Sequence, residues 1–247
     1  TENIDMDFAE PFCWQMDMSM LGVGVGFDTK GANKIIIKQP KETSAVHVVA
    51  DTREGWVEVL RVTLKAFEKG LEMPTFDYSQ VRPSGTPLKG MGGVASGPGP
   101  LMEMQENITK LLNQNIGKEI SSEVIVDLMN FSGKCVVSGG IRRTAQISFG
   151  DYNDKNFLEL KDPTKHQAEL YDRRWASNNS IFANIGMDYT QVAELTKKNG
   201  EPGYMWLENA QKYSRMNGVV DNKDYRARGG NPCLEQTLEP WELCCLV

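Results

Sequence analysis

A thiol between an amide and a carboxylate is the strongest chemical signal in the sequence. Residues 231–235 read Asn-Pro-Cys-Leu-Glu, so Cys233 has Asn231 on one side and Glu235 on the other. A thiol with a nearby base and a hydrogen-bonding amide can transfer a hydrogen atom or a proton. A glycine pair before the segment permits an unusual backbone path, and the proline stiffens it. On residue chemistry alone, a reactive thiol and a buried structural thiol are about equally good interpretations of Cys233.

Further thiols follow near the end of the chain, at Cys244 and Cys245. Residues 241–247 are expected to begin a buried strand, on which neighbouring side chains face opposite sides, so only one of the two thiols could face the site. A zinc site is the weaker alternative, because the sequence has no Cys-x-x-Cys pair and only two histidines, His47 and His166. We therefore predict no metal site.

A glycine-arginine segment at residues 138–145 is the second candidate. Two glycines before paired arginines suit a mobile loop that binds phosphate, although a solvated turn with surface arginines is the plainer interpretation. The candidate residues are Ser138, Gly139, Gly140, Arg142 and Arg143.

Two other polar or glycine-rich segments could contact a nucleotide. Residues 82–101 form a glycine-rich run that leads into a helix, where free amides near Ser96 and Gly97 could hold an anion. No Gly-Lys-Ser/Thr follows, so this is not a Walker A loop. Ser177 and Asn178 precede a strand and could lie at the rim of a site, or they could cap a helix. Close packing of backbone against backbone is the alternative for each glycine run.

These segments must be positioned by alternating helices and short strands. Strands are predicted at residues 35–37, 46–50, 134–138, 145–149 and 181–185, and residues 21–27 are either a tight strand or a loop. Helices are predicted at residues 55–71, 101–112, 121–130, 163–176, 189–198 and 204–216. Asp51 or Thr52 can cap the first of these. Strands separated by helices predict an α/β fold with a parallel sheet or barrel, whose site lies at the carboxyl ends of the strands.

Composition narrows the function classes. The net charge of −6 argues against a general nucleic-acid surface. No apolar run approaches the roughly 20 residues that a membrane-spanning helix needs. Five cysteines are an odd number without the spacing of a disulfide framework, which favours reduced thiols in the cytoplasm. The first and last residues suggest a fragment of a longer protein.

Taken together, these motifs resemble the ribonucleotide reductase catalytic subunits. The Asn-Pro-Cys-x-Glu segment looks like the radical finger loop of that family. Residues 82–101, 138–145, 200–203 and 231–235 occur in the order typical of the adenosylcobalamin-dependent class II enzymes. Residues 11–31 and 138–151, with the Cys-Cys pair, resemble the ribonucleoside-triphosphate reductase branch in particular. The resemblance covers essentially the whole chain.

The resemblance implies a ten-stranded α/β barrel with a central finger loop, of which this chain would form roughly the first half, plus an effector-region insertion. Residues 1–137 would form an effector-binding region and early barrel elements. Residues 138–247 would form a catalytic barrel segment. That segment would include an effector–substrate loop at 138–145 and the radical finger loop at 229–235.

The resemblance also implies roles for the site residues. A radical generated with adenosylcobalamin would pass to Cys233, whose thiyl would take the 3′ hydrogen of a ribonucleoside triphosphate. Glu235 would act as the base on the 3′ hydroxyl, and Asn231 would orient the substrate. Cys244 would belong to the reducing dithiol, and its partner thiol is expected upstream of Thr1.

The implied partners are a ribonucleoside-triphosphate substrate, a deoxynucleoside-triphosphate effector and a thioredoxin-like reductant. No nucleic acid or membrane is expected, the full-length protein is expected to be a monomer, and the fragment alone is expected to be inactive. Two alternatives stay open. One is the large chain of a metal-radical ribonucleoside-diphosphate reductase. The other is a non-catalytic nucleotide-binding regulatory module.

Overall fold

The computed structural model describes residues 1–88, 93–138, 145–214 and 218–244. It divides into two compact units. Unit 1 comprises Thr1–Gly22 and Gly31–Thr144, and unit 2 comprises Val23–Lys30 and Ala145–Val247. The two units therefore alternate along the chain: the first segment of unit 1 precedes β1 (Val25–Asp28) of unit 2, and its second segment lies between β1 and the next strand of the unit 2 sheet.

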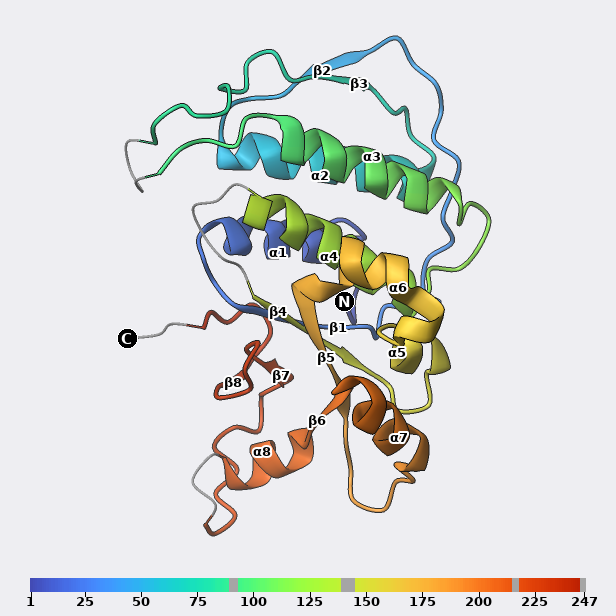
Figure 1. The fold of residues 1–247 in the computed structure, drawn as a ribbon, viewed down its shortest axis with the longest axis vertical. Coiled ribbons are helices and arrows are strands. Elements are labelled where there is room, and N and C mark those ends of the chain that lie inside the picture. The colour runs from blue at the N-terminus through green and yellow to red at the C-terminus, as the bar shows by residue number, and fades with distance from the viewer. Residues whose placement is uncertain (89–92, 139–144, 215–217, 245–247) are drawn as a thin grey trace. The chain divides into compact units, whose positions relative to one another are not determined.

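Unit 1 is built mainly from helices (Figure 1). They are α1 (Glu10–Met20), α2 (Arg53–Lys69), α3 (Gly99–Asn113) and α4 (Ser122–Ser138). Helix α1 packs against α2 and α4, and α3 packs against α2 and α4. The predicted cap of α2 is confirmed, because the Thr52 hydroxyl accepts a hydrogen bond from the Gly55 amide. The helix ends at Gly70, which has a left-handed backbone (φ 66°) that glycine adopts without strain.

Two short parallel strands, β2 (Val46–Val48) and β3 (Thr75–Asp77), complete the regular structure of unit 1. The strand predicted at residues 46–50 is confirmed in shortened form. Residues 35–37 form only an isolated bridge, from Ile36 to Glu119.

The prediction of a strand at residues 134–138 is wrong, because these residues form the last turn of α4. The valines of this stretch suggested a strand. Helix α4, however, is buried on nearly all sides, and this packing outweighs the weak strand preference of β-branched residues.

Unit 2 is organised around a four-stranded parallel sheet with the order β1-β4-β5-β6. The strands are β1 (Val25–Asp28), β4 (Gln146–Gly150), β5 (Ser177–Phe182) and β6 (Gly203–Met205). Its helices are α5 (Lys155–Glu159), α6 (Pro163–Asp172), α7 (Thr190–Asn199) and α8 (Leu207–Tyr213), with a 3-10 turn at Arg174–Ala176. The parallel sheet confirms the predicted α/β fold class.

Three predictions for unit 2 need correction. The helix predicted at residues 204–216 begins only at Leu207, because Gly203–Met205 is strand β6. The strand predicted at 181–185 lies earlier, at Ser177–Phe182. The strand predicted at 241–247 is not found over residues 241–244, where Trp241 is exposed to solvent rather than buried. In the part of the chain that the structure describes, no helix is both long and apolar enough to cross a bilayer.

Candidate functional site

A small antiparallel hairpin in unit 2 carries three of the predicted catalytic residues, Asn231, Cys233 and Glu235. Its strands are β7 (Gly229–Gly230) and β8 (Thr237–Leu238). The loop between them is closed by hydrogen bonds from the Asn231 amide to the Gln236 carbonyl (3.1 Å) and from the Leu234 amide to the Asn231 carbonyl (2.9 Å). Leu234 has a left-handed backbone (φ 58°). The tight turn leaves Cys233 exposed at the tip of the loop.

The hairpin lies directly on the backbone at the start of the sheet. A Cβ atom on Gly24 would lie 2.8 Å from Pro232 Cδ, and one on Gly26 would lie 2.1 Å from the Gly230 carbonyl oxygen. Side chains at these positions would therefore displace the hairpin. Gly24 and Gly26 therefore serve the close packing of this strand region against the hairpin.

One apolar contact fixes the tip of the hairpin. The Leu234 side chain packs against a core cluster formed by Ile147, Phe149 and Met205. These three residues come from β4 and β6, so the loop that carries Cys233 is anchored on the sheet itself.

Asn231 brings two other candidate residues together. Its side chain is 2% exposed. The Nδ2 group donates to Glu235 Oε1 and to Cys244 Sγ (3.2 Å), and Oδ1 accepts from the Gln236 amide (3.0 Å). A single buried amide therefore orients a carboxylate and a thiol close to the exposed Cys233.

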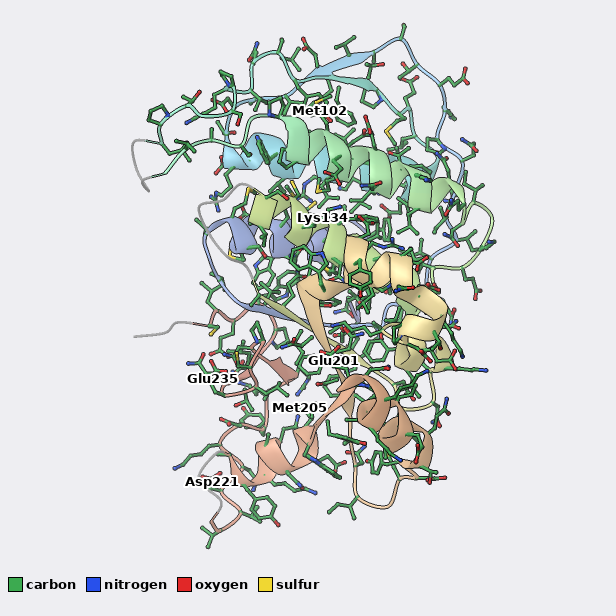
Figure 2. The ribbon with its side chains drawn as sticks, in the orientation of Figure 1. Met102, Lys134, Glu201, Met205, Asp221 and Glu235 are labelled. Atoms are coloured by element: carbon green, nitrogen blue, oxygen red, sulfur yellow. The ribbon has the colours of Figure 1, made fainter. Side chains whose placement is uncertain are left out.

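The second carboxylate oxygen of Glu235 is available to accept a hydrogen bond. Glu235 Oε2 is buried and has no hydrogen-bond partner among the described residues. A buried acceptor of this kind is normally paired in a complete site. A hydroxyl group of a bound ligand would satisfy it. Figure 2 shows Glu235 on the hairpin region of unit 2.

Two other cysteines behave as structural thiols. Cys13 and Cys135 are buried in unit 1, and burial raises the pKa of each thiol to about 12. Both thiols therefore stay protonated at neutral pH and are poor nucleophiles. The described cysteines are all free of disulfide bonds.

The candidate nucleotide-binding residues of β5 have structural partners. Asn178 Nδ2 donates to the Pro232 carbonyl (3.0 Å), which ties β5 to the loop that carries Cys233. Ser177 is buried, and its carbonyl accepts a hydrogen bond from Lys161 Nζ. The structure thus brings Asn178, but not Ser177, to the hairpin.

Lys161 and Glu201 support this strand and were not predicted as site residues. Lys161 Nζ lies 2.6 Å from Glu201 Oε2, and Glu201 Oε1 accepts a hydrogen bond from the backbone N–H of Asn179 (3.3 Å). The Gly-Glu-Pro-Gly segment at 200–203 was the only signal in the sequence, and it gave no hint of the lysine partner. Figure 2 shows Glu201 in unit 2.

Unit 1 contains a separate cavity of about 400 Å³. Ser96 and Gly97, which the sequence suggested as nucleotide contacts, line it together with residues at α1, α2 and α4 and others of the segment between β3 and α3. The remaining lining residues are Met20, Leu21, Asp51, Thr52, Arg53, Trp56, Val81, Arg82, Leu88, Ala95, Cys135 and Val136.

The arginines of this cavity are held by carboxylates. Arg82 Nε lies 2.6 Å from Asp51 Oδ2, and Arg53 Nη1 lies 2.8 Å from Asp17 Oδ1. Trp56 lines the same cavity, which therefore combines an aromatic side chain with two ion-paired guanidinium groups.

The predicted loop at 138–145 is described only at its ends. Ser138 is the last residue of α4, and its hydroxyl donates to the Lys134 carbonyl (2.8 Å). Gly139, Gly140, Arg142 and Arg143 lie outside the described residues. Within those residues, no cluster of histidine, cysteine, aspartate and glutamate could hold a metal ion.

Comparison with known proteins gives consistent matches. Residues 26–112 match the family model for the insertion domain of B12-dependent ribonucleotide reductase. The chain is 49% identical, over its full length, to an adenosylcobalamin-dependent ribonucleoside-triphosphate reductase of Euglena gracilis and to a probable one of Dictyostelium discoideum. It covers 34% and 35% of those proteins, so it spans about a third of the length of these relatives.

A solved structure agrees with these matches. The crystal structure of a B12-dependent (class II) ribonucleotide reductase superposes with a TM-score of 0.77 at 28% identity. The match covers 96% of this chain and 38% of the solved one.

Proposed function

Because the chain belongs to the B12-dependent (class II) ribonucleotide reductases, we propose that it is part of a protein that reduces ribonucleoside triphosphates to 2′-deoxyribonucleoside triphosphates for DNA synthesis. The observation that carries this proposal is the hairpin. Asn231 joins Glu235 and Cys244 beside an exposed Cys233. The chemistry needs an exposed hydrogen-abstracting thiol, a base and a reducing thiol. The hairpin carries the first two, and Asn231 binds the third, Cys244, from the segment that follows β8.

Each side chain has a distinct role in the proposed reaction. The Cys233 thiyl removes the 3′ hydrogen atom of the ribose, and Glu235 Oε2 accepts the proton of the 3′ hydroxyl. Asn231 orients the ribose and holds Glu235 in place. The 2′ hydroxyl then leaves as water. Cys244 and a second thiol elsewhere in the full-length protein supply two electrons and two protons, and they become a disulfide.

Adenosylcobalamin is the proposed source of the radical. When bound, it supplies one by homolysis of its carbon–cobalt bond. Cys233 fits such a partner, because its sulfur lies at an exposed loop tip that a group outside the hairpin can reach. The match of residues 26–112 to an insertion domain of B12-dependent enzymes supports this source over a separate metal-radical subunit.

The cavity of unit 1 is the proposed effector site. A deoxynucleoside triphosphate can place its base against Trp56 and its phosphates near Arg53 and Arg82, beside Ser96 and Gly97. Residues 139–144 connect α4 to β4 along the chain, and the segment 138–145 is proposed to carry the effector signal toward the catalytic segment. Residues 1–137 are proposed to form the effector-binding region with early barrel elements, and residues 138–247 the catalytic segment.

The remaining partners follow from the same chemistry. A thioredoxin-like protein would re-reduce the disulfide by thiol exchange. The full-length protein is inferred to be a cytoplasmic monomer that completes the ten-stranded barrel. The free cysteines support a reducing compartment.

The test uses the full-length reductase and its Cys233→Ser variant. We expect turnover to fall below detection, because a hydroxyl group cannot replace the thiyl radical, while effector binding and Tm stay at the wild-type level because Cys233 is exposed. Deoxynucleotide formation, effector titration and thermal unfolding measure the three effects. Retained turnover in this variant would reject the assignment. A paramagnetic cobalt(II) signal on adding adenosylcobalamin to the wild-type protein is expected as well, and its absence would reject the cofactor.

A further inference from the structure

The peptide bond just before Cys233 is held from two sides. On one side, Asn178 Nδ2 donates a hydrogen bond of 3.0 Å to the Pro232 carbonyl oxygen. On the other side, the Pro232 ring lies so close to Gly24 that a Cβ there would be 2.8 Å from its Cδ atom. The loop tip is therefore clamped at the residue that precedes the thiol.

This clamp acts on the backbone of Cys233 and leaves the sulfur free. The Pro232 carbonyl and the Cys233 amide belong to one planar peptide unit, so fixing the carbonyl oxygen also fixes the direction of the Cys233 Cα. After the thiol, the Leu234 side chain is buried against the core cluster of Ile147, Phe149 and Met205. Both neighbours of Cys233 are thus anchored, while the thiol itself is exposed.

Asn178 is itself held at a fixed place on the sheet. It pairs in register with Ile147 of β4. In the next residue, the side-chain oxygen of Asn179 accepts a hydrogen bond from the Ser148 hydroxyl (2.8 Å). The backbone N–H of Asn179 donates to Glu201 Oε1 (3.3 Å). The strand segment that presents the Asn178 side chain is therefore held by partners on β4 and on the segment between α7 and β6.

We propose that Asn178 is a positioning residue for the Cys233 thiol, acting through the Pro232 carbonyl rather than by contact with the nucleotide. The inference rests on the proposed function of Cys233 as the hydrogen-abstracting group. Radical transfer in both directions at a single sulfur requires a fixed geometry, and small displacements of such a group are costly to the rate.

The test compares Asn178→Ala and Asn178→Asp in the full-length protein with the adenosylcobalamin cofactor. Alanine removes the side-chain amide, and aspartate keeps its shape but replaces the donor with an oxygen that repels the carbonyl. We expect kcat to fall about 10-fold in both variants, with KM for the substrate triphosphate within about twofold of wild type. The paramagnetic signal formed with cofactor and effector should fall with kcat.

A second measurement does not depend on the cofactor. Hydrogen–deuterium exchange, followed by mass spectrometry, should be about threefold to tenfold faster in the peptide containing residues 229–238 and unchanged over α5. The matched control is Asn156→Ala, which alters an exposed asparagine on α5 and should leave kcat and hairpin exchange at wild-type values.

The outcomes separate this proposal from the proposed function. Wild-type kcat and exchange in both Asn178 variants would overturn the positioning role. A raised KM with unchanged hairpin exchange would also overturn it, because that result assigns Asn178 to nucleotide binding. If the Cys233→Ser variant stays active, the proposed function fails, yet faster exchange in the Asn178 variants would still support the clamp on the hairpin.

Discussion

Asn231 holds three partners with one side chain, and all three lie in or beside the hairpin. The sequence predicted that Asn231, Cys233 and Glu235 work together, because they are close in the chain. It did not predict that Asn231 would be buried and would reach Cys244. Such a contact depends on how the chain turns back after β8, which no local pattern specifies.

Gly26 provides a prediction at the same scale. In Gly26→Ala, the new methyl group would lie 2.1 Å from the Gly230 carbonyl, so the hairpin must shift off the sheet. We expect a loss of about 1–3 kcal/mol in the free energy of unfolding, together with a marked fall in kcat. Urea unfolding and steady-state kinetics of the full-length protein measure the two effects.

The matched control for this prediction is Gly99→Ala. A Cβ at Gly99, the first residue of α3, meets nothing within 4 Å. This variant should unfold like the wild type. Equal stability of the two alanine variants would contradict the close seating of the hairpin on β1.

At the scale of elements, the capped helices follow the sequence closely. Helix α2 was predicted from its apolar spacing and its Thr52 cap, and both are confirmed. Strand β6 was missed because three residues give too short a pattern to recognise. Most of the strand was therefore assigned to the helix predicted at 204–216. The end of α4 was misread because its burial, a tertiary property, outweighed the local preference of its valines.

The N-cap residue of α6, Asp162, forms an ion pair with Lys198 of α7. Asp162 accepts hydrogen bonds from the Thr164 amide (2.9 Å) and from Lys198 Nζ (2.7 Å). The Lys198 and Thr164 contacts hold the pKa of the Asp162 carboxyl well below its usual range. Because the folded pKa is depressed, this carboxylate stabilises the fold above its unfolded pKa of about 4, and the stabilisation disappears as the pH falls toward the folded pKa.

We therefore predict that Asp162→Asn lowers Tm at pH 7 and that its difference from wild type shrinks progressively below about pH 4. Asparagine caps helices as well as aspartate does, so the variant removes the charge and keeps the cap. Thermal unfolding across this pH range measures the effect. Asp154→Asn, on the cap of α5, is the matched control for replacing a capping carboxylate. A Tm difference for Asp162→Asn that does not change with pH would contradict the account.

At the scale of the whole molecule, the family and the fold class could be predicted from the order of the motifs, whereas the alternation of the two units along the chain could not. The residues of β1 and β4 pair side by side although residues 31–144 separate them. Nothing in either strand's own sequence specifies a partner that far away. The cavity was likewise foreseen only in part, through Ser96 and Gly97, because its other walls come from separate helices.

We predict that these 247 residues alone reduce no ribonucleotide but still bind a deoxynucleoside triphosphate. The cavity lies wholly within unit 1, while the chain spans about a third of its relatives and supplies one thiol of the proposed pair. Turnover assays with adenosylcobalamin and a dithiol should show no product. Effector titration followed by tryptophan fluorescence should show saturable quenching.

A matched pair of variants tests the binding half of this prediction. Arg82→Ala removes a cavity cation and should weaken effector binding about tenfold. Trp56→Phe should bind the effector but lose most of the quenching. Product formation by the isolated chain, or quenching that persists in Trp56→Phe, would contradict the prediction.

The alternating order of the two units along the chain also bears on how the protein reaches its native state. Pairing β1 with β4 closes a loop that contains residues 31–144, and the entropy lost on closure grows with the length of the open chain. If unit 1 folds first, the effective length of that loop becomes much shorter and the strands can meet sooner. A nucleotide that stabilises unit 1 would then also favour the pairing of β1 with β4, in addition to its proposed regulatory role.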